Sequence, residues 1–386
     1  MNRWVKVLLA VVAMVAIAAL IVLNPSPYEP EGELSRQILQ PGPFMVVQEA
    51  VEWTDTSRPT AANRDYEGDD ARTLSGRLWY PSSSEGAPYP LVVYSHGYMS
   101  SHSEGRYLVE FLVSRGYLMV SVDFPLSNGS APGGPALADV VHQPGDLSFV
   151  IDRLLARNAD SNDPLFRMID PGRIGAVGLS LGGLTTQLLA YHPDMADSRI
   201  KAAVSMAGPS EFLTPQFFSN NSLPFMYIGG TADALVPFVP NAAPITGKAR
   251  NSTLVSLQDG THLGFVNGVE VFLRWFHNPD SLGCMGLMSA LRAEQEGAGN
   301  GGVMPGFSEL LGAANGVSEA VTEPCTGQDM VRAMRPAQQQ ALVKLAVFSF
   351  LESILARDRN QRNNAGEFLL RGLPAENPQI SVTASR

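Results

Sequence analysis

Residues 178–183, with the sequence GLSLGG, decide the expected fold because they contain a Gly-x-Ser-x-Gly pattern between an expected strand and an expected helix. Residues 173–177 (RIGAV) precede it as an apolar run typical of a buried strand, and residues 184–191 follow it with a helical pattern. The glycines allow the strand and the helix to approach closely, and the tight turn projects the serine hydroxyl. The stretch therefore predicts a strand–turn–helix unit with Ser180 as a nucleophile.

An acid and a base follow in the chain order that this turn requires. Residues 223–229 (LPFMYIG) and 252–257 (STLVSL) predict two further buried strands, and Asp233 and His262 come shortly after them. Because functional sites form at the carboxyl edge of parallel sheets, we expect both side chains to lie near Ser180. The imidazole would take the serine proton, and the carboxylate would hold the imidazole in the correct tautomer. The spacing thus predicts a Ser-His-Asp triad.

Other residues compete for these roles. Asp233 is also a common turn residue, and its rivals as the acid are Asp259, Glu211 and Asp123. Only His262 follows the last strand of the series; we interpret the other histidines as surface or structural residues: His96, His102, His142, His192 and His277. No pair of histidines has the helical spacing of a metal site, so no metal is expected.

A second turn predicts the oxyanion hole. Residues 91–95 form an apolar strand that ends in His96 and Gly97, and the N–H groups of Tyr98 and Leu181 are the expected oxyanion donors. An apolar acyl site is expected from five side chains: Tyr98, Met99, Phe124, Leu179 and Phe212.

Four motifs carry a family resemblance: residues 95–98 (SHGY), 178–183 (GLSLGG), 230–233 (GTAD) and 260–262 (GTH). They resemble those of α/β-hydrolases, and within that superfamily those of platelet-activating-factor-acetylhydrolase-like and polyester-hydrolase (cutinase-like) serine esterases. The resemblance covers about residues 73–277. It implies an α/β fold with a mostly parallel central sheet flanked by helices, and ester hydrolysis through an acyl-enzyme.

Two departures from related families narrow the expected chemistry. Ser180 replaces the cysteine found at this turn in dienelactone hydrolases. Polyester hydrolases usually have an aromatic residue beside the nucleophile and a tryptophan after the next strand, whereas this chain has Leu179 and Ala207.

The favoured function is a serine carboxylic ester hydrolase that acts on small or short-to-medium acyl esters and needs no cofactor. The alternatives are a polyester hydrolase, an amidase or peptidase of the same fold, and a non-catalytic binding module of the cell envelope. The formal charge of −10 argues against nucleic acid or an anionic membrane surface as a partner.

The N-terminus and the cysteines indicate export. An apolar run of 17 residues over 7–23 follows the basic Arg3 and Lys6, so residues 1–23 are interpreted as a signal anchor or a signal peptide. We favour the anchor, which would hold a periplasmic or extracytoplasmic enzyme on the inner membrane. Cys284 and Cys325 are then expected to form a disulfide.

The rest of the chain divides by composition. Residues 24–43 read as a Pro-rich linker and residues 44–357 as the α/β-hydrolase domain. Within that domain, residues 278–335 form an insertion before the closing helix at 338–356, and it is either a partial lid or a stabilising appendage. Residues 358–386 read as a loosely attached tail.

Overall fold

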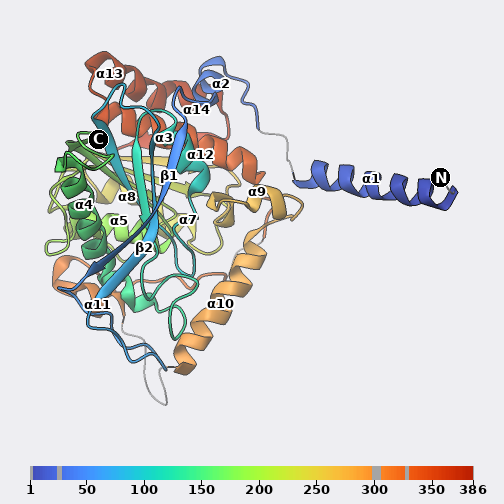
Figure 1. Cartoon of the computed structure of the whole chain (residues 1–386). Helices are drawn as coiled ribbons and strands as arrows, with labels where there is room; N and C mark the ends of the chain where they lie inside the picture. The colour runs from blue at the N-terminus through green and yellow to red at the C-terminus, as the bar shows by residue number, and fades with distance from the viewer. Residues whose placement is uncertain (1–2, 24–27, 298–305, 327–329, 386) are drawn as a thin grey trace.

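The computed structural model describes residues 3–23, 28–297, 306–326 and 330–385. Within these residues it has a nine-stranded sheet with helices on both faces (Figure 1). The strands are β1 (Val46–Asp55), β2 (Arg72–Pro81), β3 (Tyr89–Ser95), β4 (Leu118–Val122), β5 (Ile169–Leu179), β6 (Ile200–Met206), β7 (Phe225–Gly230), β8 (Ser252–Leu257) and β9 (Ile380–Ala384). Their spatial order is β1-β2-β4-β3-β5-β6-β7-β8-β9.

The central strands are parallel and buried on both faces. β3 to β8 pair in parallel, whereas β1, β2 and β9 add antiparallel pairings at the edges. Every residue of β3, β4 and β7 is buried, which explains why these strands read as continuous apolar runs. The expected α/β fold with a mostly parallel sheet is confirmed.

Helices cover the two faces of this sheet. The longer ones are α3 (Arg106–Val113), α4 (Gln143–Ala159), α5 (Leu181–Tyr191), α10 (Asp280–Gly297), α12 (Pro336–Leu355) and α13 (Arg359–Glu367). Short helices are α6 (Pro215–Phe218), α7 (Phe238–Asn241), α8 (Ile245–Lys248), α9 (Val269–Phe272), α11 (Phe307–Leu311) and α14 (Leu373–Glu376). The apolar cores on opposite faces contain α4 and α5 on one side, and α3 and α12 on the other.

The register of the sheet positions the loops that follow its strands. β5 lies between β3 and β6, and β7 and β8 follow on the same side. Because these strands are parallel, the loops after β3, β5, β7 and β8 emerge at one edge. That edge receives Tyr98, Ser180, Asp233 and His262.

The N-terminal segment forms α1 (Arg3–Leu23), which projects away from the sheet domain in Figure 1. Across the described part of the chain, no helix has both the length and the apolar character needed to cross a membrane. The expected membrane anchor over residues 1–23 is therefore not supported.

Two segments are more ordered than their composition indicated. Residues 24–43, read as a linker, contain α2 (Glu33–Leu39), and Glu376 of α14 accepts hydrogen bonds from the N–H groups of Leu34 and Ser35. Over the described residues 358–385 the C-terminal segment is not a loose tail, because β9 pairs with β8 from Thr253↔Ala384 to Leu257↔Ile380. The prediction of a loose tail was wrong because β9 pairs with β8, a strand that lies far away in the sequence.

Two connecting segments contain short or interrupted helices. Residues 266–277 contain only the single turn α9. Residues 137–159 form a 3₁₀ turn at Leu137–Val141 followed by α4, with Pro144 in the first turn of α4. Proline fits a first helical turn, where its missing N–H has no intrahelical partner, and it disfavours a helical residue before it.

Candidate active site

Ser180 lies on a strained turn between β5 and α5. Its φ of 56° and ψ of −122° are rare for a residue with a side chain. A Cβ on Gly178 would come within 2.0 Å of the Gly182 carbonyl oxygen, and a Cβ on Gly182 within 2.0 Å of the Ser95 carbonyl oxygen. The two glycines therefore allow the strand, the helix and the end of β3 to meet around the serine.

His262 and Asp233 form a buried hydrogen-bonded pair. His262 Nδ1 lies 2.8 Å from Asp233 Oδ2. Asp233 Oδ1 also accepts hydrogen bonds from the N–H groups of Leu235 and Val236, at 3.0 and 2.7 Å. These contacts fix the carboxylate and require His262 to carry its proton on Nδ1, which leaves Nε2 as the proton acceptor.

Two of the three rival acids have other partners, and the third is exposed. Asp123 binds His102, with 2.9 Å between His102 Nδ1 and Asp123 Oδ2. Glu211 accepts hydrogen bonds from the N–H and hydroxyl of Thr322. Asp259 is exposed on the turn before the histidine. Among the described residues, the carboxylate bonded to the His262 ring is that of Asp233.

The loop that carries His262 is held by two later segments of the chain. Asp280, the first residue of α10, accepts hydrogen bonds from the N–H groups of Ala234, His262 and Leu263 at 3.0, 2.9 and 2.8 Å. Gln339 of α12 accepts from the Thr261 N–H and donates to the Thr261 carbonyl. Asp280 thus connects the acid loop to the histidine loop through one buried carboxylate.

The electrostatics of this cluster favour a basic imidazole. Burial lowers the pKa of His262, but the charge and hydrogen bond of Asp233 outweigh it, so the pKa lies above its ordinary value. The charges of Asp280 and Glu104 act in the same direction. Burial and the nearby Asp233 raise the pKa of Asp280 to about 6.

The oxyanion loop after β3 is fixed at Gly97. His96 Nε2 accepts the Phe124 N–H at 3.0 Å, so His96 Nδ1 carries the proton and donates to the Gly97 carbonyl at 2.8 Å. Burial lowers the pKa of His96 to about 4, which keeps this imidazole neutral. The Gly97 N–H donates to the buried carboxyl of Glu104.

The two expected oxyanion donors are free to bind a ligand. Within the described residues, neither the Tyr98 N–H nor the Leu181 N–H donates a hydrogen bond to a protein atom. Both residues line the same pocket as Ser180 and His262. The geometry therefore leaves two backbone donors beside the nucleophile.

A pocket with a volume of about 510 Å³ opens at this edge of the sheet. Of the predicted acyl-site residues, Tyr98, Met99, Leu179 and Phe212 line it. Phe124 does not, and that prediction was wrong. Its side chain is fully buried in the core, with its ring centroid 4.9 Å from that of His96.

The insertion forms a wall of this pocket. It contributes Gly283, Gly286, Leu287, Leu291, Phe307, Val321, Thr322 and Pro324 to the lining. Cys284 of α10 is joined to Cys325 by a disulfide, with 5.7 Å between the Cα atoms. Phe307 stacks on Phe212 with 4.2 Å between ring centroids. The insertion is thus packed against the loops that carry the predicted triad.

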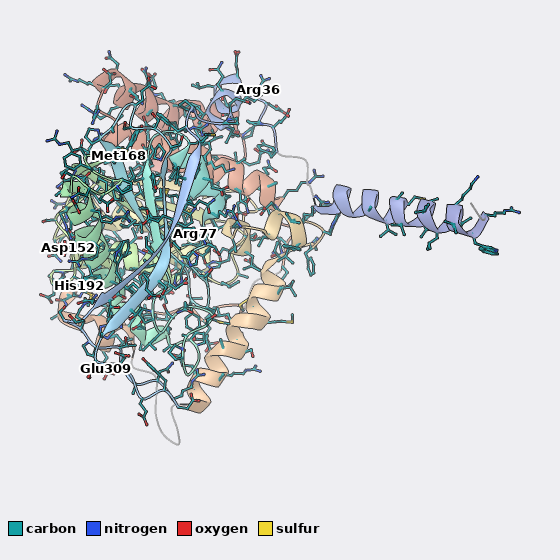
Figure 2. All side chains as sticks on the ribbon, in the orientation of Figure 1. Arg36, Arg77, Asp152, Met168, His192 and Glu309 are labelled. Atoms are coloured by element: carbon teal, nitrogen blue, oxygen red, sulfur yellow. A yellow bond between two sulfur atoms is a disulfide. The ribbon has the colours of Figure 1, made fainter. Side chains whose placement is uncertain are left out.

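His192 does not line the pocket. His192, labelled in Figure 2, lies next to α11 with its Nε2 2.9 Å from the Leu311 carbonyl oxygen. No cluster of three or more potential metal ligands occurs among the residues that the structure describes.

Sequence reasoning missed three acidic residues at the site: Glu104, Asp280 and Glu294. A weak sequence signal could have pointed to Asp280, because Asn278-Pro279-Asp280 is typical of a helix start. Glu104 and Glu294 have no such sequence signal, since loop packing determines which residues they contact.

Known proteins match this chain over the segment that carries the site. The family model described as "PET hydrolase-like" matches residues 68–274. "Cutinase est1" of Thermobifida alba is 25% identical over 195 residues, which cover 48% of this chain and 57% of that protein. "Cutinase 2" of Thermobifida cellulosilytica and "Cutinase cut1" of Thermobifida fusca are each 24% identical over 195 residues, covering 64% and 53% of their own lengths and 48% of this chain. The chain thus spans between half and two thirds of these curated relatives.

Proposed function

This chain belongs to the PET hydrolase-like family of α/β-hydrolases, and from that premise we propose that it is a serine carboxylic ester hydrolase. One observation carries the proposal. The His262–Asp233 hydrogen bond of 2.8 Å lies at the pocket that also holds Ser180 on its strained turn. The cutinase relatives support the same reaction class.

In the proposed first half-reaction, Ser180 Oγ attacks the ester carbonyl carbon while His262 Nε2 takes the hydroxyl proton. Asp233 holds the imidazole in the required tautomer and stabilises the imidazolium that forms. The N–H groups of Tyr98 and Leu181 bind the oxyanion of the tetrahedral intermediate. His262 then gives its proton to the leaving alcohol, and Ser180 remains acylated.

In the second half-reaction, His262 takes a proton from water, and the resulting nucleophile attacks the acyl-enzyme carbonyl. The same two N–H groups bind the second oxyanion. The carboxylic acid leaves, and His262 returns the proton to Ser180 Oγ. Each proton and each electron pair is thereby accounted for by residues of this chain and by water.

Cleavage of a polyester is the second candidate function, favoured by the description of the matching family. Two positions weigh against it: Leu179 precedes the nucleophile, and Ala207 follows β6. A panel of matched esters and amides, together with a polyester film, separates these candidates from an amidase.

The test of the mechanism is Ser180→Ala with Ser82→Ala, on an exposed loop, as the matched control. We expect Ser180→Ala to lose ester hydrolysis and labelling by a serine-directed probe, while its circular dichroism spectrum is retained. Residual turnover of roughly 10³ over water is compatible with the proposal, since an oxyanion hole alone supplies that much. Hydrolysis near the wild-type rate in Ser180→Ala would refute the mechanism. A wild-type protein that neither reacts with the probe nor cleaves an ester would instead be a binding module.

We further propose that the enzyme is exported and that residues 278–335 act as a partial lid. Export is supported by the Cys284–Cys325 disulfide, because such bonds persist in oxidising compartments. The lid is supported by the eight insertion residues in the pocket lining. Mass spectrometry of unreduced protein from fractionated cells tests export, and two free thiols would contradict it.

A further inference from the structure

Helix α10 is attached at both of its ends to loops of the candidate active site. At its first residue, Asp280 accepts the N–H groups of His262 and Leu263. Near its other end, Glu294 accepts the Tyr98 hydroxyl at 2.9 Å and the Leu137 N–H at 2.8 Å. Asp280 and Glu294 are 14 positions apart, so the helix extends roughly 21 Å between the attachments. It therefore bridges from the histidine side of the pocket to the oxyanion side.

The face of α10 between these attachments lines the pocket. It presents Gly283, Gly286, Leu287 and Leu291. A Cβ on Gly283 would meet Leu235 and Leu263 at 3.2 Å, so the helix is packed tightly on the triad loops there. A Cβ on Gly286 would meet nothing within 4 Å, so the space that a side chain at this position would enter is open. The helix thus has both a packed part and an open part.

The charge of the lining selects against acidic acyl groups. Glu104 and Glu211 contribute carboxyl groups, and none of the described lining residues is a lysine or an arginine. Most of the other lining side chains are apolar. An acyl group with its own carboxylate would meet no cation here, whereas an aliphatic chain gains from burial against the leucines.

Resting on the proposed ester hydrolase function, we propose that the substrate is a single dissolved ester with an uncharged aliphatic acyl chain that lies beneath α10. The volume of about 510 Å³ is that of a site for one small molecule. A strand of solid polyester must continue past the reacting ester in both directions. A helix bonded to loops on both sides of the pocket obstructs that path, so polymer surfaces are excluded.

The test uses two substitutions on α10 with opposite expected effects. Gly286→Leu adds a side chain to the open space and should lower the ratio of kcat/KM for the octanoyl ester to that for the acetyl ester by about tenfold or more. Leu287→Ala removes a lining side chain and should raise the same ratio. Met285→Leu, on the exposed side of the same helix, is the matched control and should leave the ratio unchanged.

Full-length protein is assayed with p-nitrophenyl acetate, butanoate, hexanoate and octanoate, a half-ester bearing a carboxylate, and a polyester film. We expect the wild type to favour the longer neutral esters and to release no product from the film. Film hydrolysis, preference for the acidic half-ester, or equal effects of Gly286→Leu and Leu287→Ala on every chain length would overturn the substrate assignment. Failure of a folded wild type on every ester would instead refute the proposed function itself.

Discussion

Asp280→Asn tests whether the start of the insertion positions the triad. The carboxylate accepts three N–H groups, two on Oδ2 from Ala234 and His262 and one on Oδ1 from Leu263. Asparagine has a single acceptor oxygen, and its amide group faces the remaining N–H. In the better of the two orientations one buried N–H is left without an acceptor.

The magnitude follows from these contacts. A buried donor without a partner costs about 1–3 kcal/mol, and hydrogen bonds to charged groups lie in the upper part of that range. Because the pKa of Asp280 is about 6, the carboxylate is charged at pH 8. Burial raises this pKa from 3.8, so loss of the charge also relieves roughly 3 kcal/mol at pH 8 and opposes the cost of the unpaired N–H. We therefore expect the free energy of unfolding of Asp280→Asn to differ from that of the wild type by less than about 2 kcal/mol at pH 8, so that the catalytic effect is measured on a folded protein.

A second readout separates positioning from stability. The Asp280 charge raises the pKa of His262, so its removal should lower that pKa. His262 must be neutral to act as the base, and activity is lost as the pH falls through its pKa. The acid limb of the kcat/KM profile should therefore move to lower pH in Asp280→Asn, and kcat should fall.

The assays are urea unfolding at pH 8 and pH profiles of ester hydrolysis. Asp194→Asn, an exposed substitution of the same kind, is the control. A variant that loses stability but keeps the wild-type kcat and acid limb would show that Asp280 is only structural. A variant with the wild-type stability, kcat and acid limb would refute the hydrogen-bond reasoning.

Three further changes have defined outcomes. Asp233→Asn should lower kcat by roughly 10⁴-fold, because the imidazole would then favour the wrong tautomer; steady-state ester hydrolysis measures this. A larger loss in Asp259→Asn would show that Asp259 is the acid of the triad. Burial raises the pKa of Glu104 to about 7 from 4.5, so its contribution to stability is present below 4.5 and is lost as the pH rises through about 7. In urea unfolding, the free energy of unfolding of the wild type should therefore fall by roughly 3 kcal/mol relative to that of Glu104→Gln over this pH range. The same pH dependence of stability in both proteins would contradict this prediction. Cys284 and Cys325 are 41 residues apart in the sequence, so reduction of their disulfide should lower the free energy of unfolding by roughly 4 kcal/mol in the loop-entropy model and loosen α10. An unchanged melting temperature after reduction would contradict this prediction.

The sequence alone determined the strand–turn–helix unit at Ser180 and the positions of Asp233 and His262 after later strands. These features have local signals: apolar runs of strand length, glycines where backbones must touch, and a polar residue just after each strand. Parallel pairing then brings such loops to one edge whatever the details of packing. For that reason Ser180 and His262 line one pocket, and Asp233 is hydrogen-bonded to His262 behind it.

Tertiary structure alone decided the parts that depend on contacts between distant segments. The position after β4 suggested that Phe124 lines the cleft, but the turn directs its ring into the core against His96. Asp280 and Glu294 gain their partners only because α10 crosses from one loop cluster to another. β9 becomes a strand only because the exposed edge of β8 offers backbone donors and acceptors to it. No local pattern encodes these pairings, because each one depends on where a remote part of the chain is placed when the domain packs.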